Sequence, residues 1–289
     1  MFALATVVVR GQPVAALRAD GEYWPLPAAG LPADAMALFG DWRRSLGLMS
    51  RMKRRGRPIA AGKARLLTPL RYPRKLFCVG ANYADHLEEM NAAHLAKKVP
   101  GAPPFFFMKP PSTTLVGPGR TVRIPDGCRN FDWEVEFVVV FGRGGKNIRE
   151  KDAMKHVAGY SLGVDFTARD LFFRDERFFK FDFVLGKCQD TMSPVGPAMV
   201  PREFLDGNRA RFSLSVNGSQ KQAGNTADMI YSIAEQIAGV SRAVTIEPGD
   251  MMFTGSPAGV GLPRGEKLKP GDVVRIEADA IGAMEVGIR

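Results

Sequence analysis

The sequence predicts a β-rich α+β protein. Glycine and proline are frequent, with 31 and 21 copies among 289 residues, and such counts are typical of chains with many turns. Most apolar segments are short and stop at a Gly or Pro turn, which indicates strands rather than helices. One longer segment, residues 225–244, stands out because its apolar residues recur at the helical spacing.

The first 70 residues are expected to form a small accessory domain. The elements expected there are strands at 2–9 and 14–26, joined by the turn GQP, and a short helical stretch at 31–49. Lysine and arginine outnumber the acids by 14 to 4 in residues 1–75, which accounts for the whole net charge of +10. Because this excess ends where the strand-like segment 75–83 begins, we place a boundary at residue 70 and a main domain at 71–289.

The main domain is predicted to consist mostly of strands. The segments expected to contain strands are 75–83, 105–113, 131–142, 159–171, 211–222, 245–259 and 268–282. The strands in 105–113 and 159–171 should run into turns, and those in 245–259 and 268–282 should follow Pro-Gly turns. Asn217-Gly218 separates two alternating runs and predicts a hairpin turn. The helix 225–244 is expected to begin at a cap on Asn225 or Thr226, and its apolar stripe should face the core.

The basic run 51–57 is the densest cluster of charge. Such a run is either a nucleic-acid or membrane patch or a solvated loop that steers anions. No aromatic residue interleaves it and no nucleic-acid-binding motif accompanies it, so the solvated loop is favoured and nucleic acid is an unlikely partner. No apolar run approaches the ~20 residues of a membrane span. The start shows no signal peptide, and the scattered Cys78, Cys128 and Cys188 fit a reducing compartment, so we expect a cytoplasmic protein.

Acidic and apolar residues alternate at the start of segment 131–142. Asp132, Glu134 and Glu136 should share one face of a strand, and buried like charges need a neutralising partner. Glu134 and Glu136 are spaced to hold one hard divalent cation, and Asp165, an acid in an apolar run, is a candidate third ligand. The alternatives are an exposed sheet face paired with lysines and, for Asp165, a turn-capping role.

His86 and Glu89 are three residues apart, the spacing of neighbours on a helical turn. A carboxylate beside imidazole raises its basicity, as in a base that activates water; a surface histidine beside an acid is the alternative. Lys109 and Lys187 each follow an apolar stretch, and each either ends at a pocket or extends to solvent. The Gly/Pro/Ser loop 254–261 offers backbone donors to an anion, although such a loop is a weak signal.

Together these motifs resemble the fumarylacetoacetate hydrolase family. The resemblance spans roughly residues 76–280, about seven tenths of the chain. The matching segments occur in the family's order: CVGANYADHLEE, MKPPST, DWEVEFVVVFG, GYSLGVDFTARD, LGKCQDTMSPVGP, VNGSQKQ, NTADMIYSIAE, TIEPGDMMFTGSPAGVG and LKPGDVVRIE. The resemblance implies the family's rolled, barrel-like mixed sheet for the catalytic domain 71–289, and a homodimer or larger assembly.

The resemblance also implies roles for individual residues. The implied metal ligands are Glu134, Glu136 and Asp165, the implied catalytic residues are His86, Glu89 and Lys187, and the expected substrate contacts are Lys109, Arg169, Phe172, Thr254, Gly255 and Ser256. Two residues depart from the family pattern: Phe172 stands where many members have Gln, and Ser256 where many have Thr. Six phenylalanines between 172 and 183 line either an apolar pocket or an interface between subunits.

We therefore expect an enzyme that uses Mg²⁺, with Mn²⁺ or Ca²⁺ as alternatives, on small anionic keto acids. The leading hypothesis is C–C bond hydrolysis of an acylpyruvate or a fumarylacetoacetate-like β-diketo acid, in the catabolism of aromatic compounds. The alternative is a decarboxylase or isomerase of a 2-keto or 2-hydroxydiene diacid, of the oxaloacetate or 2-hydroxyhepta-2,4-diene-1,7-dioate type. A nucleic-acid-binding protein that uses basic residues 51–75 is a remote third hypothesis.

Overall fold

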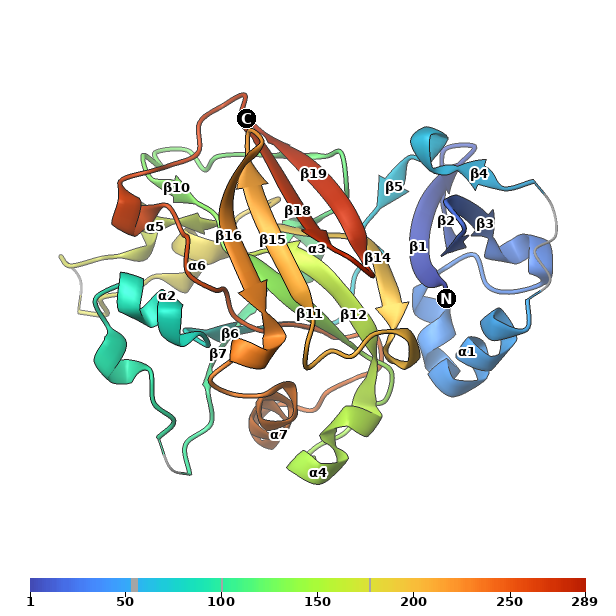
Figure 1. Ribbon diagram of the computed structural model, residues 1–289, viewed down its shortest axis with the longest axis horizontal. Helices are drawn as coiled ribbons and strands as arrows, with labels where there is room; N and C mark the ends of the chain where they lie inside the picture. Colours follow the sequence, from blue (N-terminus) through green and yellow to red (C-terminus); the bar gives the residue numbers. More distant parts are fainter. Residues whose placement is uncertain (53–56, 100, 177) are drawn as a thin grey trace.

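The computed structural model describes residues 1–52, 57–99, 101–176 and 178–289 (Figure 1). Four residues of the basic run 51–57, namely 53–56, lie outside the described residues, so its predicted role stays a prediction.

A twelve-stranded mixed sheet forms the centre of the molecule. Its strands in spatial order are β4 (Ile59–Ala60), β3 (Glu22–Pro25), β2 (Gln12–Ala19), β1 (Ala3–Val9), β14 (Ser193–Pro201), β12 (Val157–Val164), β11 (Val135–Phe141), β17 (Met251–Phe253), β6 (Leu76–Gly80) and β7 (Phe105–Lys109), with β5 (Leu66–Leu67) beside β1 and β8 (Leu115–Val116) beside β14. Most pairs are antiparallel, whereas β17–β6 and β14–β8 are parallel. Apolar residues fill β11 and β12, whose residues are all buried, as expected for strands covered on both faces.

A second sheet lies over one face of the first (Figure 1). Its strands are β16 (Ser219–Asn225), β15 (Arg211–Val216), β18 (Val273–Ala278), β19 (Gly282–Ile288) and β9 (Thr121–Val122), and a short separate pair joins β10 (Phe131–Asp132) to β13 (Thr167–Ala168). Side chains of both sheets form one core, in which the rings of Phe137 and Phe212 lie 6.3 Å apart. The apolar faces of β15 and β18 alternate with exposed residues, as expected for strands that face the core on one side.

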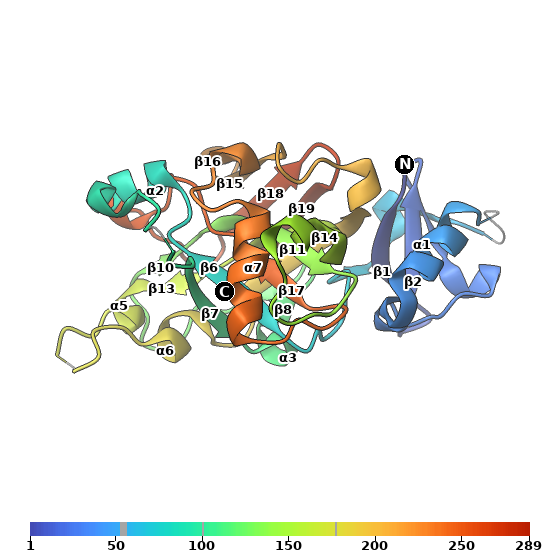
Figure 2. The ribbon, with the colours of Figure 1, turned by 90° about the horizontal axis from the view of Figure 1, so that it is seen from below.

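Helices occupy the edges of the sheets (Figure 2). The α-helices are α1 (Trp42–Ser50), α2 (Ala84–Glu89), α3 (Pro111–Thr114), α4 (Glu150–Ala153), α5 (Arg169–Phe172), α6 (Phe183–Lys187) and α7 (Ile233–Ala243). The 3₁₀ turns are η1 (Leu26–Ala29), η2 (Met36–Asp41), η3 (Ala61–Lys63), η4 (Ala93–Leu95), η5 (Met154–His156), η6 (Arg202–Phe204), η7 (Thr226–Asp228) and η8 (Leu262–Arg264). This content confirms the predicted β-rich α+β class.

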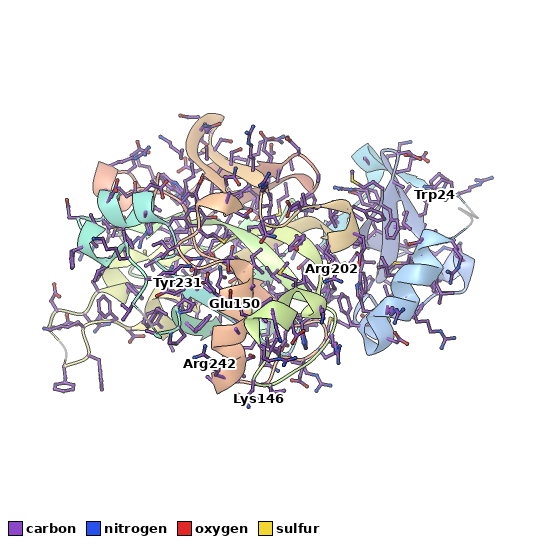
Figure 3. All side chains as sticks on the ribbon, turned by 60° about the horizontal axis from the view of Figure 1, so that its bottom comes forward. Trp24, Lys146, Glu150, Arg202, Tyr231 and Arg242 are labelled. Carbon is purple, nitrogen blue, oxygen red and sulfur yellow. The ribbon has the colours of Figure 1, made fainter. Side chains whose placement is uncertain are left out.

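The N-terminal part lies at one end of the molecule, where Figure 3 marks Trp24. Leu38, Phe39 and Trp42 pack there in a second core that reaches the face of the central sheet opposite the second sheet. β1 pairs with β14 through Leu4 and Met199, so the central sheet continues across residue 70. The division into domains at that residue stays a prediction.

Several predicted elements have different bounds in the structure. The single strand predicted at 14–26 is the hairpin of β2 and β3, with a turn at Asp20 and Gly21. Segment 131–142 is two strands rather than one, because side chains replace the backbone ladder at the break: Asp132 accepts the N–H of Trp133, and Gln222 accepts the N–H of Val135. The predicted helix 225–244 begins only at Ile233.

The late start of α7 follows from a stronger capping signal within the same segment. Ser232 accepts the N–H of Glu235, whose side chain accepts the N–H of Ser232, so the two form a capping box. Asn225 instead caps the 3₁₀ turn η7 through the N–H of Ala227. The predicted hairpin at Asn217-Gly218 is confirmed, with φ of 50° and 80° at the two turn residues.

Candidate active site and metal centre

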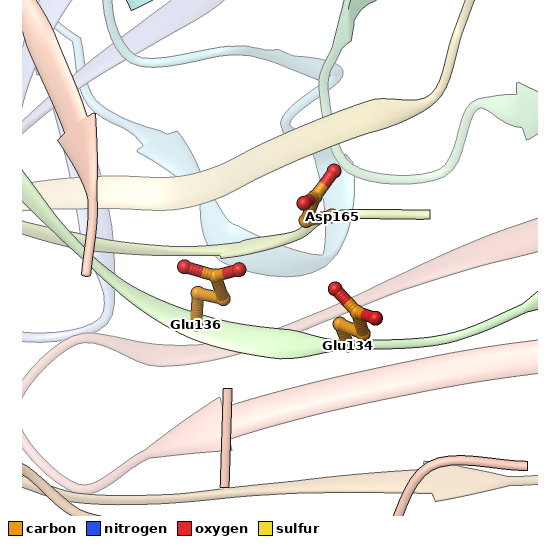
Figure 4. Close-up of side chains that lie close together, drawn as sticks. All are labelled: Glu134, Glu136 and Asp165. Atoms are coloured by element: carbon orange, nitrogen blue, oxygen red, sulfur yellow. The ribbon is translucent and has the colours of Figure 1, made fainter. Parts of the chain in front are cut away.

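Three buried carboxylates meet where β11 and β12 run side by side (Figure 4). Glu134 and Glu136 flank the first residue of β11, and Asp165 directly follows β12. The antiparallel register pairs Val135 with Val164, and the N–H of Asp165 donates to the carbonyl of Glu134. One oxygen from each carboxylate therefore lies within 4.8 Å of the others, as the sequence predicted for these three acids.

Three buried cations surround the carboxylates. Lys187 Nζ, at the end of α6, lies 2.6 Å from Glu134 and 2.7 Å from Asp165. Lys109 Nζ, at the end of β7, lies 2.5 Å from Asp165 and also donates to the carbonyl of Met192. The predicted substrate contact Lys109 is therefore held inside the acidic cluster, with 1% of its surface exposed.

Arg169, the first residue of α5, joins two of the acids. Its Nε donates to Asp132 at 2.9 Å, and its Nη2 lies 2.6 Å from Glu134, although this second contact is an ion pair without hydrogen-bond alignment. Asp132 also accepts the N–H groups of Gly261 and Leu262. The sequence placed Asp132 in one acidic row with Glu134 and Glu136, and Arg169 does contact both Asp132 and Glu134. Asp132 is not one of the three clustered carboxylates, because it also binds the backbone loop at Gly261 and Leu262.

Glu136 is the carboxylate without a cation of its own. In the part of the chain that the structure describes, its one hydrogen bond comes from the backbone N–H of Gly255, at 2.5 Å. Burial, and then the negative charges of Asp165 and Glu134, raise its pKa well above the usual value. Burial acts in the same direction on Glu134, but Lys187 and then Arg169 outweigh it and lower the pKa of that carboxyl to about 2.

This arrangement fits a divalent metal ion. Four buried carboxylates (Asp132, Glu134, Glu136 and Asp165) face three buried cations (Lys109, Arg169 and Lys187), so the group has one excess negative charge when all seven are ionised. Glu136 is the carboxylate whose ionised form is disfavoured without a further cation. The three clustered carboxylates offer oxygen ligands, which Mg²⁺, Mn²⁺ and Ca²⁺ prefer. An ion bound between them would neutralise that charge.

His86 and Glu89 lie together on α2, as predicted. Nδ1 of His86 is 2.9 Å from Oε1 of Glu89. Glu89 is held in turn by the backbone N–H groups of Gly259 and Val260. Burial acts to raise the pKa of Glu89, but the bonds from His86 and from Gly259 outweigh it and lower the pKa. With Nδ1 held by Glu89, Nε2 is the ring nitrogen of His86 that is left for proton exchange. The imidazole also helps to lower the pKa of Glu134.

Thr254 and Gly255 use their hydrogen-bond donors within the protein. Both the N–H and the hydroxyl of Thr254 donate to the carbonyl of Phe137, and the N–H of Gly255 donates to Glu136. The hydroxyl of Ser256 accepts a hydrogen bond from Gln222. Their predicted contact with substrate stays a prediction.

Gln222 is a site residue that the sequence analysis missed. It is 1% exposed and links the start of β11 to the loop through Val135, Ser256 and Pro257. It is one of three amide side chains in the polar strand β16, so its sequence does not distinguish it from a surface residue.

Phe172 ends α5 and lies against Gly186, the neighbour of Lys187. Its ring contacts those of Phe173, Phe181 and Phe183. Phe178 and Phe179 are 90% and 78% exposed and contact each other. The aromatic run therefore has one group of rings that contacts Phe172 beside the site, although Phe173 and Phe181 are 38% and 53% exposed, and an outer pair that is more exposed.

A sequence profile described as the C-terminal domain of fumarylacetoacetate hydrolase matches residues 75–289. The chain belongs to the fumarylacetoacetate hydrolase family. The predicted family is confirmed, and with it the fold: fumarylacetoacetate hydrolase from Exiguobacterium antarcticum superposes with a TM-score of 0.82 and 29% identity, over all of this chain and 99% of that one.

Other relatives in the fumarylacetoacetate hydrolase family carry the names of isomerising enzymes. Oxaloacetate tautomerase fahd2, mitochondrial, of Xenopus laevis is 40% identical over 222 residues, which are 76% of this chain and 66% of that protein. The match thus spans just under two thirds of that relative's length. A 2-hydroxyhepta-2,4-diene-1,7-dioate isomerase from Mycobacterium marinum has 26% identity and a TM-score of 0.74, with coverage of 100% of this chain and 98% of that one.

The comparisons support the enzyme assignment but do not confirm the specific expectation of a hydrolase, since one of these three relatives is named a hydrolase and two are named for isomerisation. No helix in the described part of the chain is long and apolar enough to cross a membrane. The expected cytoplasmic location stays a prediction.

The acidic cluster yields a prediction about Glu136→Gln. Mn²⁺ should raise the melting temperature of the wild-type protein, since a ligand at 100 times its Kd adds about 2.7 kcal/mol of stability. The variant should stay folded without metal, because it loses a buried charge that its neighbours repel, but should lose the metal-induced rise. Differential scanning calorimetry with and without Mn²⁺ measures both. Glu285→Gln, on β19 with a side chain 54% exposed, is the control. An undiminished rise in Glu136→Gln would contradict the ligand assignment.

Proposed function

We propose that this chain is a divalent-metal-dependent enzyme that interconverts the keto and enol forms of small 2-oxo dicarboxylic acids of the oxaloacetate type. The observation that carries the proposal is the placement of a His–Glu pair beside a buried cluster of three carboxylates and three cations. Cations at such a site would stabilise an anionic substrate and the further negative charge that develops on its oxygen when it becomes an enolate. The names of the Xenopus and M. marinum relatives support isomerisation over hydrolysis.

Glu134, Glu136 and Asp165 would hold the metal, with Mg²⁺ as the proposed ion and Mn²⁺ or Ca²⁺ as alternatives. When bound, such an ion supplies a Lewis acid that stabilises negative charge on the substrate's oxygen atoms. Lys187 adds a fixed positive charge next to Glu134 and Asp165, where an anionic substrate would lie against the cluster.

His86 is the proposed carrier of the proton. In the enol-to-keto direction the enol oxygen loses a proton and carbon 3 gains one, so His86 would accept the proton from the enol oxygen and donate a proton to carbon 3. Glu89 accepts the Nδ1–H of His86, which fixes the tautomer and leaves Nε2 as the base. Because Gly259 and Val260 hold Glu89, the ring stays oriented through the exchange.

Hydrolysis of an acylpyruvate is the second candidate function. It is favoured by the same pair, because a histidine oriented by an anchored carboxylate can take a proton from water as well as from an enol. The similarity to the Exiguobacterium fumarylacetoacetate hydrolase also supports it. Decarboxylation of oxaloacetate would pass through the same enolate.

A substrate panel with Mg²⁺ tests the proposed function. We expect loss of the enol's ultraviolet absorbance with oxaloacetate to be faster than either release of pyruvate from oxaloacetate or cleavage of acylpyruvates. If the rate of acylpyruvate cleavage is the highest and rises with acyl length, as ~0.8 kcal/mol per buried CH₂ would produce, the hydrolase is correct and tautomerisation is not the main reaction.

His86→Ala should lower the kcat for oxaloacetate tautomerisation by roughly 10²–10⁴, the usual contribution of a general acid or base. His94→Ala is the matched control, since His94 lies on η4 and is exposed. Circular dichroism should show both variants folded. A tautomerisation rate that His86→Ala leaves unchanged would remove the histidine from the mechanism.

We also propose that the chain forms a homodimer through the outer aromatic pair, Phe178 and Phe179. Aromatic residues are enriched in the cores of protein interfaces, and these two rings are largely exposed. The double variant Phe178→Ser/Phe179→Ser should be a monomer by light scattering where the wild-type protein is a dimer. The double variant Leu95→Ser/Val99→Ser, at residues 60% and 63% exposed, should leave the mass unchanged. A dimer that persists in the phenylalanine variant would contradict this interface.

A further inference from the structure

Lys187 is a buried cation with one hydrogen-bond donor to spare. The residue is 6% exposed, and its Nζ lies 2.6 Å from Glu134 and 2.7 Å from Asp165. A lysine ammonium carries three N–H donors. Among the residues that the structure describes, the two carboxylates are the only hydrogen-bond acceptors of Nζ, so the third N–H has no conventional partner there. Because a buried charge is costly on any side that lacks a partner, the third N–H needs an explanation.

An aromatic ring lies beside this ammonium. The Nζ atom of Lys187 is 5.5 Å from the centroid of the Phe107 ring. A cation within about 6 Å of a ring centroid is attracted to the negative potential of the ring face. Within the described part of the chain, Phe107 is the ring over which Lys187 lies.

Strand β7 brings Phe107 to the carboxylate cluster. Phe107 and Lys109 are two residues apart on this strand, so their side chains lie on the same face. From that face, Nζ of Lys109 reaches Asp165. Phe106 lies on the opposite face, against Gly239 of α7, where an added Cβ would be 3.2 Å from the Phe106 ring. One face of β7 therefore supplies a cation to the cluster and an aromatic ring to the second cation.

Helix α6 holds the ring and the ammonium together. Phe183 and Lys187 are the first and last residues of α6, and their spacing of four makes them neighbours on one face of the helix. The Phe183 ring lies 5.1 Å from the Phe107 ring. The Sγ of Cys188, the next residue, donates to the carbonyl of Met108 at 3.5 Å. Contacts at both ends of α6 therefore hold this helix against β7.

We infer that the face of the Phe107 ring is the third partner of the Lys187 ammonium and keeps this charge beside Glu134 and Asp165. The inference deepens the role of Lys187 in the proposed function and rests on that function for its effect on catalysis. An aromatic ring attracts the ammonium without adding a negative charge, so Lys187 keeps its charge available to an anionic substrate. Phe107 is thus a positioning residue rather than a catalytic one.

Fluorinated phenylalanines at position 107 test the inference. One, two or three ring fluorines progressively cancel the negative potential of the ring face and leave the shape of the side chain nearly unchanged. Across this series, we expect the equilibrium constant for unfolding of the metal-free protein in urea to rise by about 2–30-fold. This range corresponds to the roughly 0.5–2 kcal/mol of a cation–π contact at about 1.36 kcal/mol per tenfold.

The kcat provides the functional measurement. It is measured with Mg²⁺ on the substrate that the wild-type protein converts fastest. We expect kcat to fall across the Phe107 series by about 2–30-fold, with a smaller change in KM, because Lys187 acts on charge that develops during the reaction. The same analogues at Phe183 are the matched control, since this ring packs on Phe107 but is not the ring over which Lys187 lies. The control series should show no trend with the number of fluorines.

The outcomes separate this inference from the proposed function. If the wild-type protein converts no substrate of the panel, the proposed function fails, and the urea series alone decides whether the ring holds the ammonium. If the wild type is active, a flat unfolding constant or a flat kcat across the Phe107 series overturns the inference and leaves the proposed function standing. An equal trend in the Phe183 series would also overturn it, because the effect would then belong to ring packing.

Discussion

The structure depends on an imbalance of buried charge. Four carboxylates and three cations are buried together beside β11, and removing charges from water is costly unless each has a partner. The pairing of β11 with β12 holds Glu134, Glu136 and Asp165 in place. The three cationic side chains belong to residues at the ends of β7, α5 and α6. Because Glu136 has no cation beside it among the described residues, its ionised form is favoured only when a further cation binds.

One loop connects this cluster to the proton-exchanging pair. Gly255 bonds to Glu136, Gly259 bonds to Glu89, and Gly261 bonds to Asp132. A single stretch of backbone therefore fixes a proposed metal ligand, the carboxylate that orients His86, and the acid that holds Arg169. The side-chain geometry needed for enolate chemistry is thus built on backbone donors, which are more rigid than side-chain contacts.

The sequence could predict the acids and the His–Glu pair because local periodicity determines which side chains are neighbours. A period of two places Glu134 and Glu136 on one face, and a spacing of three joins His86 to Glu89. The break of the strand at residue 133 could not be predicted, because it depends on Gln222, almost ninety positions away in the chain. The partners of Asp132 depend on a contact with Arg169, far away in the chain, and periodicity does not encode such contacts. The start of α7 depends on which of two possible N-caps is the stronger, and periodicity does not encode that either.

The most direct test of this account is a crystal soaked in Mn²⁺, with anomalous diffraction recorded at the manganese edge. The account predicts one strong anomalous peak at about 2.0–2.6 Å, the range of oxygen–metal distances in such sites, from carboxylate oxygens of Glu134, Glu136 and Asp165. A fully soaked crystal with no peak there, and with Lys187 still bridging Glu134 and Asp165, would contradict it.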